Sequence, residues 1–474
     1  MISPPRRPPP AFDPRALREI PAEIMRRYDV PGPRYTSYPT APVWDDAFGE
    51  ADHERALRQS AAGGRPLSVY VHLPFCESLC IYCGCNVIIT RRRERADAYV
   101  ERLVREIRHS AALCGAAERR TVQVAWGGGT PTYLAPDQIE RLMHEIAAAF
   151  PLAADAEIGI EVDPRVTTRE HVAAIARAGF NRISMGIQDF DPRVQEEIHR
   201  VQPYELTRDL IAWCRDDGLA SVNVDLVYGL PHQSPDQFDR TIALVKTLEP
   251  DRISAFSYAH VPWLKPQQRK FKDEWLPKAP VKFEIFTRLV EQMTADGYAF
   301  IGMDHFAKPG NELALAQDSG ALWRNFQGFT TKAGTDLVGL GVTSIGSFED
   351  AFAQNVKELD AWNARIDGSR LPTHRGMWLD DDDRIRRDVI QDVMCRYRFE
   401  PDAIAARHGI DAQRYFAREI AGLPALEADG MLVTDGRGGF ELTSRGRVFV
   451  RNVCMTFDAH LDPHADKPVF SRTV

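Results

Sequence analysis

Residues 67–85 read Leu-Ser-Val-Tyr-Val-His-Leu-Pro-Phe-Cys-Glu-Ser-Leu-Cys-Ile-Tyr-Cys-Gly-Cys. The first seven residues are a short apolar run with β-branched side chains, which predicts a buried strand. Three cysteines follow in a Cys-x3-Cys-x2-Cys arrangement, at Cys76, Cys80 and Cys83, and Cys85 comes two residues later. The stretch therefore predicts a strand that runs directly into a cysteine-rich loop.

The spacing of these cysteines favours an iron-sulfur cluster. Three thiolates hold three irons of a 4Fe-4S cube and leave the fourth iron without a protein ligand. S-adenosylmethionine can chelate such an iron through its amino and carboxylate groups, and one electron then releases a 5′-deoxyadenosyl radical. The alternatives are cysteines without a ligand, or a zinc site that includes Cys85. Structural zinc normally uses two ligand pairs separated by a longer stretch.

Five further apolar runs alternate with amphipathic stretches along the chain. The runs are 121–126, 157–162, 182–187, 221–227 and 252–258, and the helical patterns between them are 96–113, 136–150, 168–178, 204–217 and 234–247. This alternation predicts parallel strands joined by crossover helices. The fold class is therefore α/β, a full or partial TIM-type barrel of six strand-helix units whose site lies at the carboxyl ends of the strands.

Several polar or glycine-rich clusters stand just behind these strands. The glycines of Gly127-Gly128-Gly129-Thr130 let a ligand approach the backbone closely. Alternatively, they form a turn before a helix that binds no ligand. Glu161 is either a surface carboxylate or an acceptor for ligand hydroxyl or amino groups. Asp225 lies in an apolar strand, where an unpaired carboxylate is costly, so we expect it to bind a ligand.

The two ends of the chain differ in composition from the middle. We expect a helix around residues 13–27, then an extended arm over 31–40 that either straps the body or closes a site with Arg34 and Tyr35. A polar break at 379–387 precedes helices and a hairpin (431–434 and 440–443) that resemble a winged helix. The predicted domains are 1–50, 51–375 and 376–474. The preceding helix, 413–421, is not strongly basic, which disfavours DNA binding.

The overall charge favours neither nucleic acid nor an anionic membrane as partner. The 474 residues carry a formal net charge of −8. We find no run of about 20 apolar residues that would span a bilayer. Prolines follow Arg6 and Arg7 where a secretory signal needs an apolar run. Clustered cysteines then indicate metal chemistry in the cytoplasm.

Seven motifs together resemble one family, the oxygen-independent coproporphyrinogen III oxidases of the radical S-adenosylmethionine (SAM) superfamily. The resemblance runs from about Arg26 to the C-terminus. Its motifs are Gly-Pro-Arg-Tyr-Thr-Ser-Tyr-Pro (32–39), the cysteine loop, Trp-Gly-Gly-Gly-Thr-Pro-Thr (126–132), Ser-Met-Gly-Ile-Gln-Asp-Phe (184–190), Gly-Met-Asp-His-Phe (302–306), Asn-Phe-Gln-Gly (325–328) and Arg-Asn-Val-Cys-Met (451–455).

The resemblance implies oxidative decarboxylation of the ring A and B propionates of coproporphyrinogen III to vinyl groups, giving protoporphyrinogen IX in haem biosynthesis. It also implies a 4Fe-4S cluster on Cys76, Cys80 and Cys83 and two SAM molecules. The implied contacts of the cluster-bound molecule are Tyr70, Gly128, Glu161 and Ile345. Those of the second molecule are Tyr82, Gly129, Thr130, Gln188, Arg200, Asp225 and Ala259.

Other expectations concern catalysis and partners. Cys85 resembles the family's fourth cysteine, which is not a cluster ligand, and is a candidate catalytic thiol. Val87 departs from the basic residue that members often carry. Arg34 is the first candidate to bind a propionate, since arginine suits carboxylates. Arg91-Arg92-Arg93 is either a solvated helix start or a docking patch for an acidic electron donor such as flavodoxin or ferredoxin.

The main alternative is a haem-binding chaperone of the same superfamily. Such relatives generally lack the Gly-Pro-Arg-Tyr arm and carry an aromatic residue where Cys85 stands, so both features favour the oxidase. An RNA-modifying radical enzyme would need a basic surface that the composition does not offer. We expect a monomer.

Overall fold

Six parallel strands form the middle of a twelve-stranded sheet in the computed structural model, which describes residues 7–461 and 470–473. Each strand pairs with the next along the chain. All six predicted strands are thereby confirmed. They are β1 (Leu67–Leu73), β4 (Thr121–Gly128), β5 (Leu152–Val162), β6 (Arg182–Gln188), β7 (Ser221–Tyr228) and β8 (Arg252–Ser257).

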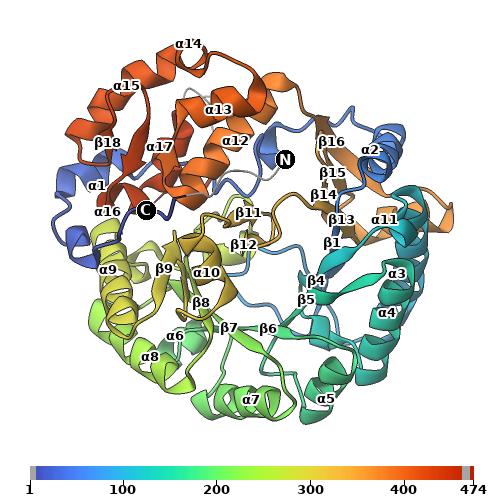
Figure 1. The fold of residues 1–474 in the computed structure, drawn as a ribbon. Coiled ribbons are helices and arrows are strands. Elements are labelled where there is room, and N and C mark those ends of the chain that lie inside the picture. Colours follow the sequence, from blue (N-terminus) through green and yellow to red (C-terminus); the bar gives the residue numbers. More distant parts are fainter. Residues whose placement is uncertain (1–6, 462–469, 474) are drawn as a thin grey trace.

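The five predicted crossover helices are confirmed to within two residues at each end, and they cover the outer side of the sheet (Figure 1). The Thr168 and Ser234 side chains cap the third and last of them by accepting backbone N–H hydrogen bonds. The helices are α3 (Glu94–Leu113), α4 (Pro136–Ala149), α5 (Arg169–Arg177), α7 (Tyr204–Asp216) and α8 (Pro235–Leu248). A short helix that was not predicted, α6 (Pro192–Glu197), precedes α7.

The sheet continues beyond the predicted strands at both edges. Next to β1 lie the parallel β13 (Asp336–Leu340) and then the antiparallel β14 (Ile345–Ser347), β15 (Ala351–Asn355) and β16 (Thr373–Trp378). Next to β8 lie β10 (His305–Ala307) and β9 (Ala299–Gly302), both antiparallel to their neighbours. The order runs from β16 to β9 without closing, so the fold is a partial barrel (Figure 1).

The N-terminal part is less helical than predicted. A single helix over 13–27 is wrong: a 3-10 turn, η1 (Pro14–Leu17), is followed by a separate helix, α1 (Ala22–Tyr28), which begins after Pro21. The arm behind it is extended, and its Tyr35 and Tyr38 side chains are buried. The Tyr35 hydroxyl donates to Asp458 at 3.0 Å, so Tyr35 packs toward the C-terminal helices and not into the barrel.

The C-terminal part is mainly helical, as predicted. Residues 379–387 are not a break, however: from Asp381 they form the first turns of α12 (Asp381–Arg396), capped by Asp380. The predicted helix 413–421 is two helices, α14 (Ala412–Tyr415) and α15 (Ala417–Ala428). The predicted hairpin is present as β18 (Leu432–Thr434) and β19 (Phe440–Leu442), with β17 (Arg398–Phe399) as a third strand. The domain boundaries stay predictions.

The remaining elements lie around the site and at the edges of the sheet. They are α2 (Glu50–Gly63), α9 (Ala279–Ala295), α10 (Glu312–Asp318), α11 (Leu359–Asp367), α13 (Pro401–His408), α16 (Ser444–Val448), α17 (Val450–Met455), β2 (Phe75–Cys76), β3 (Ile88–Ile89), β11 (Trp323–Asn325), β12 (Gly328–Thr330) and the 3-10 turns η2 (Ala41–Val43), η3 (Ala116–Glu118), η4 (Pro131–Tyr133), η5 (Pro266–Lys270) and η6 (Asp273–Trp275).

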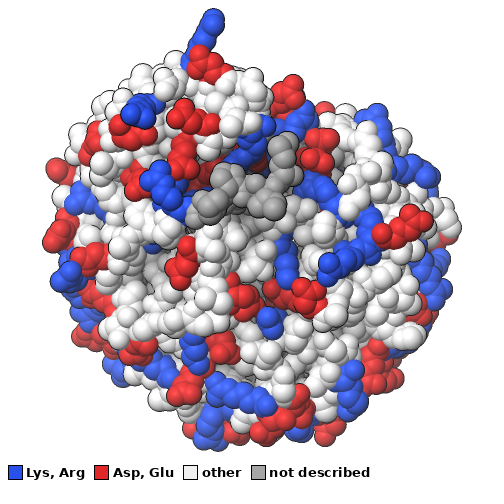
Figure 2. Space-filling model, viewed as in Figure 1, with Lys and Arg blue, Asp and Glu red and all other residues white. Residues whose placement is uncertain are grey.

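Within residues 7–461 and 470–473, no helix has the length and apolar character to cross a membrane. Figure 2 shows basic and acidic side chains interspersed over most of one face.

Candidate active site

Two adjoining cavities lie at the carboxyl ends of the parallel strands, where the polar clusters were predicted to meet. The first has a volume of about 420 Å³ and is lined by the cysteine loop and by residues behind β4 to β8. The second, of about 540 Å³, reaches into the barrel. Four residues line both cavities: Glu161, Ser184, Asp225 and Phe256. The two cavities therefore share a wall at the centre of the barrel.

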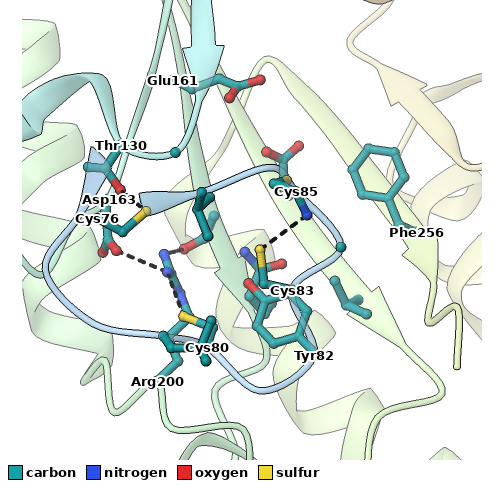
Figure 3. A pocket seen from close by; sticks show the side chains of 18 of the residues that line it. Cys76, Cys80, Tyr82, Cys83, Cys85, Thr130, Glu161, Asp163, Arg200 and Phe256 are labelled. Carbon is teal, nitrogen blue, oxygen red and sulfur yellow. Dashed lines mark hydrogen bonds and ion pairs between the residues drawn. The ribbon is translucent and has the colours of Figure 1, made fainter. Parts of the chain in front are cut away.

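The sulfur atoms of Cys76, Cys80 and Cys83 face the interior of the cysteine loop (Figure 3). Cys76 Sγ lies 3.4 Å from the Thr130 hydroxyl, behind β4. Cys83 Sγ accepts a hydrogen bond from the Cys85 backbone N–H at 3.4 Å. The loop thus presents three thiols toward one space, and Cys85 supports Cys83 through its backbone.

Two arginines place positive charge beside Cys80. Arg165 Nη2 and Arg200 Nη1 lie 3.5 and 3.8 Å from Cys80 Sγ. Arg200 also pairs with Asp163 at 3.0 Å and donates to the Gly186 carbonyl at 2.7 Å. Both guanidinium groups therefore bring positive charge to the Cys80 side of the loop. Arg200, a predicted SAM contact, thus lies between the cysteine loop and the strands.

Asp163 anchors both arginines. Burial would raise the pKa of this carboxyl, but Arg200 and Arg165 together lower it to about 2. Asp163 and Arg165 were not singled out in the sequence, although both follow β5 directly behind Glu161. The sequence signal for them was an acidic residue and a basic residue two positions apart at the end of a predicted strand.

The thiols differ in their electrostatic setting. Hydrogen bonding from Cys85, acting against burial, lowers the pKa of Cys83 to about 6. Burial raises the pKa of the Cys76 thiol to about 11, with Thr130 opposing the rise. Three inward thiols, adjacent guanidinium groups and a roomy cavity together fit a cluster held by three cysteines.

Glycines bring β4 close to the cysteine loop. A Cβ at Gly128 would lie 2.5 Å from the His72 ring, and one at Gly129 would lie 2.7 Å from the Pro74 carbonyl carbon. The Gly129 N–H donates to Leu73 and the Thr130 N–H to Phe75, at 2.8 and 2.9 Å. The glycines therefore allow the turn to pack closely on the protein's own backbone. Gly129 and Thr130 also line the first cavity.

Two carboxylates lie at the wall shared by the cavities: Glu161 is exposed to the cavity space, and Asp225 is half-buried. Desolvation by the surrounding protein, and then the neighbouring Asp225, raises the pKa of Glu161 to about 7, although the Gly128 N–H donates to Glu161 at 3.3 Å. Asp225 accepts hydrogen bonds from Ser184 at 3.0 Å and from Asn223 at 2.8 Å. Burial still raises the pKa of Asp225. Ser184 and Asn223 were not predicted to act here.

The other predicted contacts divide between the cavities. Tyr82, Gln188 and Ala259 line the first cavity, and Tyr70 and Ile345 line the second. Cys85 and Val87 also line the first cavity. Arg34 lines neither: it forms an ion pair with Asp304 and lies over the Phe256 ring, 5.6 Å from its centroid. The residue roles themselves stay predictions.

A segment that sequence reasoning missed supports the cysteine loop from outside. Gln268 donates to the Tyr82 carbonyl at 3.0 Å, Gln267 to the Cys83 carbonyl at 2.9 Å, and Lys265 to the Cys85 carbonyl at 2.9 Å. All three come from η5 or the residue before it. Backbone contacts of this kind leave no motif, because many polar side chains could make them.

Comparison with known proteins gives the family. The radical SAM superfamily model matches residues 70–245. Oxygen-independent coproporphyrinogen III oxidase of Salmonella typhimurium is 45% identical over 451 residues, covering 95% of this chain and 98% of that protein. This chain belongs to the oxygen-independent coproporphyrinogen III oxidase family.

Other members of the family agree over the same length. The oxidase of Synechocystis is 42% identical over 460 residues, covering 96% of this chain and 98% of its own. The solved structure of coproporphyrinogen III oxidase (HemN) from Escherichia coli, a radical SAM enzyme, superposes with a TM-score of 0.87 at 45% identity. It covers 90% of this chain and 98% of the Escherichia coli chain. The protein is thus a radical SAM oxidoreductase, and its family implies a 4Fe-4S cluster and SAM.

Proposed function

We propose that this protein converts the ring A and B propionates of coproporphyrinogen III to vinyl groups, giving protoporphyrinogen IX. The supporting observation is the three-cysteine loop at the mouth of two joined cavities, in a chain 45% identical to relatives of that name over nearly its whole length. Each conversion removes a β-hydrogen, carbon dioxide and one further electron, which passes to an acceptor.

The cluster and SAM would supply the 5′-deoxyadenosyl radical when bound. Cys76, Cys80 and Cys83 would hold the cluster, with Arg200 and Arg165 offsetting negative charge at Cys80. The Glu161 carboxylate would accept from the amino or ribose groups of SAM at the shared wall.

Two SAM molecules fit the division of the site. The contacts carried over for the second molecule all line the first cavity. Of those carried over for the cluster-bound molecule, Tyr70 and Ile345 line the second cavity, Gly128 lines the first, and Glu161 lines both. Each cavity lies in the size range of small-ligand sites. Equilibrium dialysis of the cluster-loaded protein would give close to two SAM per chain. One SAM per chain would reject the proposal.

The deciding experiment is anaerobic incubation of reconstituted protein with reductant, SAM and coproporphyrinogen III, followed by mass analysis. Loss of two carboxyl groups is the expected result. Haem binding without decarboxylation would assign the chain to the chaperone instead. A Cys80→Ala variant serves as the control, because it removes a proposed cluster ligand and should form no product.

We further propose a cytoplasmic monomer that binds neither nucleic acid nor membranes and is reduced by a flavodoxin or ferredoxin. The interspersed surface charge in Figure 2 supports the absence of nucleic acid. Arg91 and Arg92 are exposed and stand before α3, close in sequence to the cysteine loop. Arg93 instead pairs with Glu77 and stacks on Tyr133, so it would contribute less to a docking patch.

A further inference from the structure

A third, small cavity lies between the arm, α9, α17 and the ends of β7 and β8. Its volume is about 40 Å³, and Tyr228, Ser257, Phe286 and Met303 form part of its wall. Three cationic side chains, Arg34, Lys282 and Arg451, also line it. Asp304 is the carboxylate that lines it among the residues that the structure describes. The cavity therefore carries an excess of positive charge.

Within residues 7–461 and 470–473, the partners of these groups leave that excess uncompensated. Asp304 is already occupied, because it pairs with Arg34 and lies 2.7 Å from His305 Nδ1. Arg451 donates to the main-chain carbonyls of Pro33 at 2.8 Å, Arg472 at 3.1 Å, and Gly32. Those carbonyls carry no net charge, so the guanidinium has no counter-ion there.

Lys282 is a half-buried cation in the wall of this cavity. Within the described residues its amine has no hydrogen bond and no ion pair, and its stem packs so that a Cβ at Gly229 would lie 3.0 Å from Lys282 Cε. Burial lowers the pKa of Lys282, the carboxylate of Asp29 raises it, and Arg472 and Arg451 lower it again. Asp29 is itself bound by Arg472 at 2.7 Å.

The pKa of Arg451 is lowered by burial and by a neighbouring cation. Burial, and then repulsion from Arg34, lowers the pKa of Arg451 to about 9. Cations held together in a poorly solvated space are costly unless an anion joins them. Room for about three water molecules suffices for a carboxylate but not for a pyrrole ring. The cavity thus fits the end of an acidic side chain.

The small cavity adjoins the reaction site. Ser257 lines both this cavity and the first large cavity, and its neighbour Phe256 lines both large cavities. None of the four loop cysteines lines it. We propose that Lys282 and Arg451 bind a propionate carboxylate of the tetrapyrrole that is held and not decarboxylated. This inference rests on the proposed function, since it takes its ligand from that substrate.

The test compares Lys282→Met with Lys278→Met, which removes the same charge from an exposed lysine four residues earlier, outside the cavity. The probes are coproporphyrin III, the oxidised form of the substrate, and its tetramethyl ester. Fluorescence titration should show Lys282→Met binding coproporphyrin III roughly ten- to a hundredfold more weakly, since a charged hydrogen bond is lost. Binding of the ester should not change, and Lys278→Met should match the unaltered protein.

Stability and turnover separate the outcomes. Lys282→Met should be at least as resistant to urea as the unaltered protein, because it removes an unpaired cation, and KM should rise more than kcat falls. Equal affinity of Lys282→Met and the unaltered protein for coproporphyrin III would overturn the inference even if carbon dioxide is released. If affinity falls as expected but no carbon dioxide is released, the proposed function fails and the carboxylate site stands.

Discussion

Replacing Gly129 by alanine tests the close approach between β4 and the cysteine loop. The added Cβ would lie 2.7 Å from the Pro74 carbonyl carbon and 2.8 Å from the Phe75 carbonyl oxygen. Ordinary contact begins at 3.4 Å, so the backbones must separate by 3.4 − 2.7 = 0.7 Å. The hydrogen bonds from the Gly129 and Thr130 N–H groups to Leu73 and Phe75 resist that movement.

Overpacking of this kind costs about 1–3 kcal/mol, and a lost backbone hydrogen bond adds about 1 kcal/mol. Because Cys76 follows Phe75 directly, the displacement reaches the first proposed cluster ligand. We expect Gly129→Ala to hold less iron and sulfide per chain after anaerobic reconstitution, and to bind SAM at least tenfold more weakly. Gly422→Ala is the control, since a Cβ there meets nothing within 4 Å. Iron content and SAM affinity equal to those of the unaltered protein would refute the reasoning.

Three further changes probe other parts of the site. Glu161, with a raised pKa of about 7, is protonated below that pH, so SAM affinity should fall roughly tenfold from pH 8 to pH 6, and Glu161→Gln should abolish this dependence in equilibrium titrations. Asp163→Asn strands buried guanidinium charge and should lower the free energy of unfolding in urea by about 3–5 kcal/mol, where a loss below about 1 kcal/mol would contradict the pairing. Arg91→Glu with Arg92→Glu should slow reduction by flavodoxin about tenfold at low salt, whereas a merely solvated helix start predicts an unchanged rate.

The central barrel could be predicted because its strands and helices repeat a simple pattern. Each apolar run was long enough to be a buried strand, and the helical patterns 168–178 and 234–247 begin at Thr168 and Ser234, whose side chains cap α5 and α8 in the structure. The flanking strands β9, β10 and β13 to β16 are three to six residues long and, apart from the β13 pairing with β1, antiparallel, so they show no comparable periodicity. Their place in the sheet depends on the pairing of β10 with β8 and of β13 with β1, which local sequence does not encode.

The site was predicted in part for the same reason. Cysteine spacing and strand-end clusters placed Cys76, Glu161 and Asp225 together, because parallel strands end at one edge. Arg34 could not be placed, since its ion pair with Asp304 joins residues 270 positions apart. Lys282 was also missed, because a single lysine on an amphipathic helix has the pattern of a solvated residue.

The claim that three cysteines leave an iron open toward SAM is tested most directly by electron paramagnetic resonance of the reduced, anaerobically reconstituted protein. We predict a 4Fe-4S signal that changes when SAM is added, in the unaltered protein and in Cys85→Ala alike. A signal that is indifferent to SAM, or the loss of the cluster in Cys85→Ala, would contradict it.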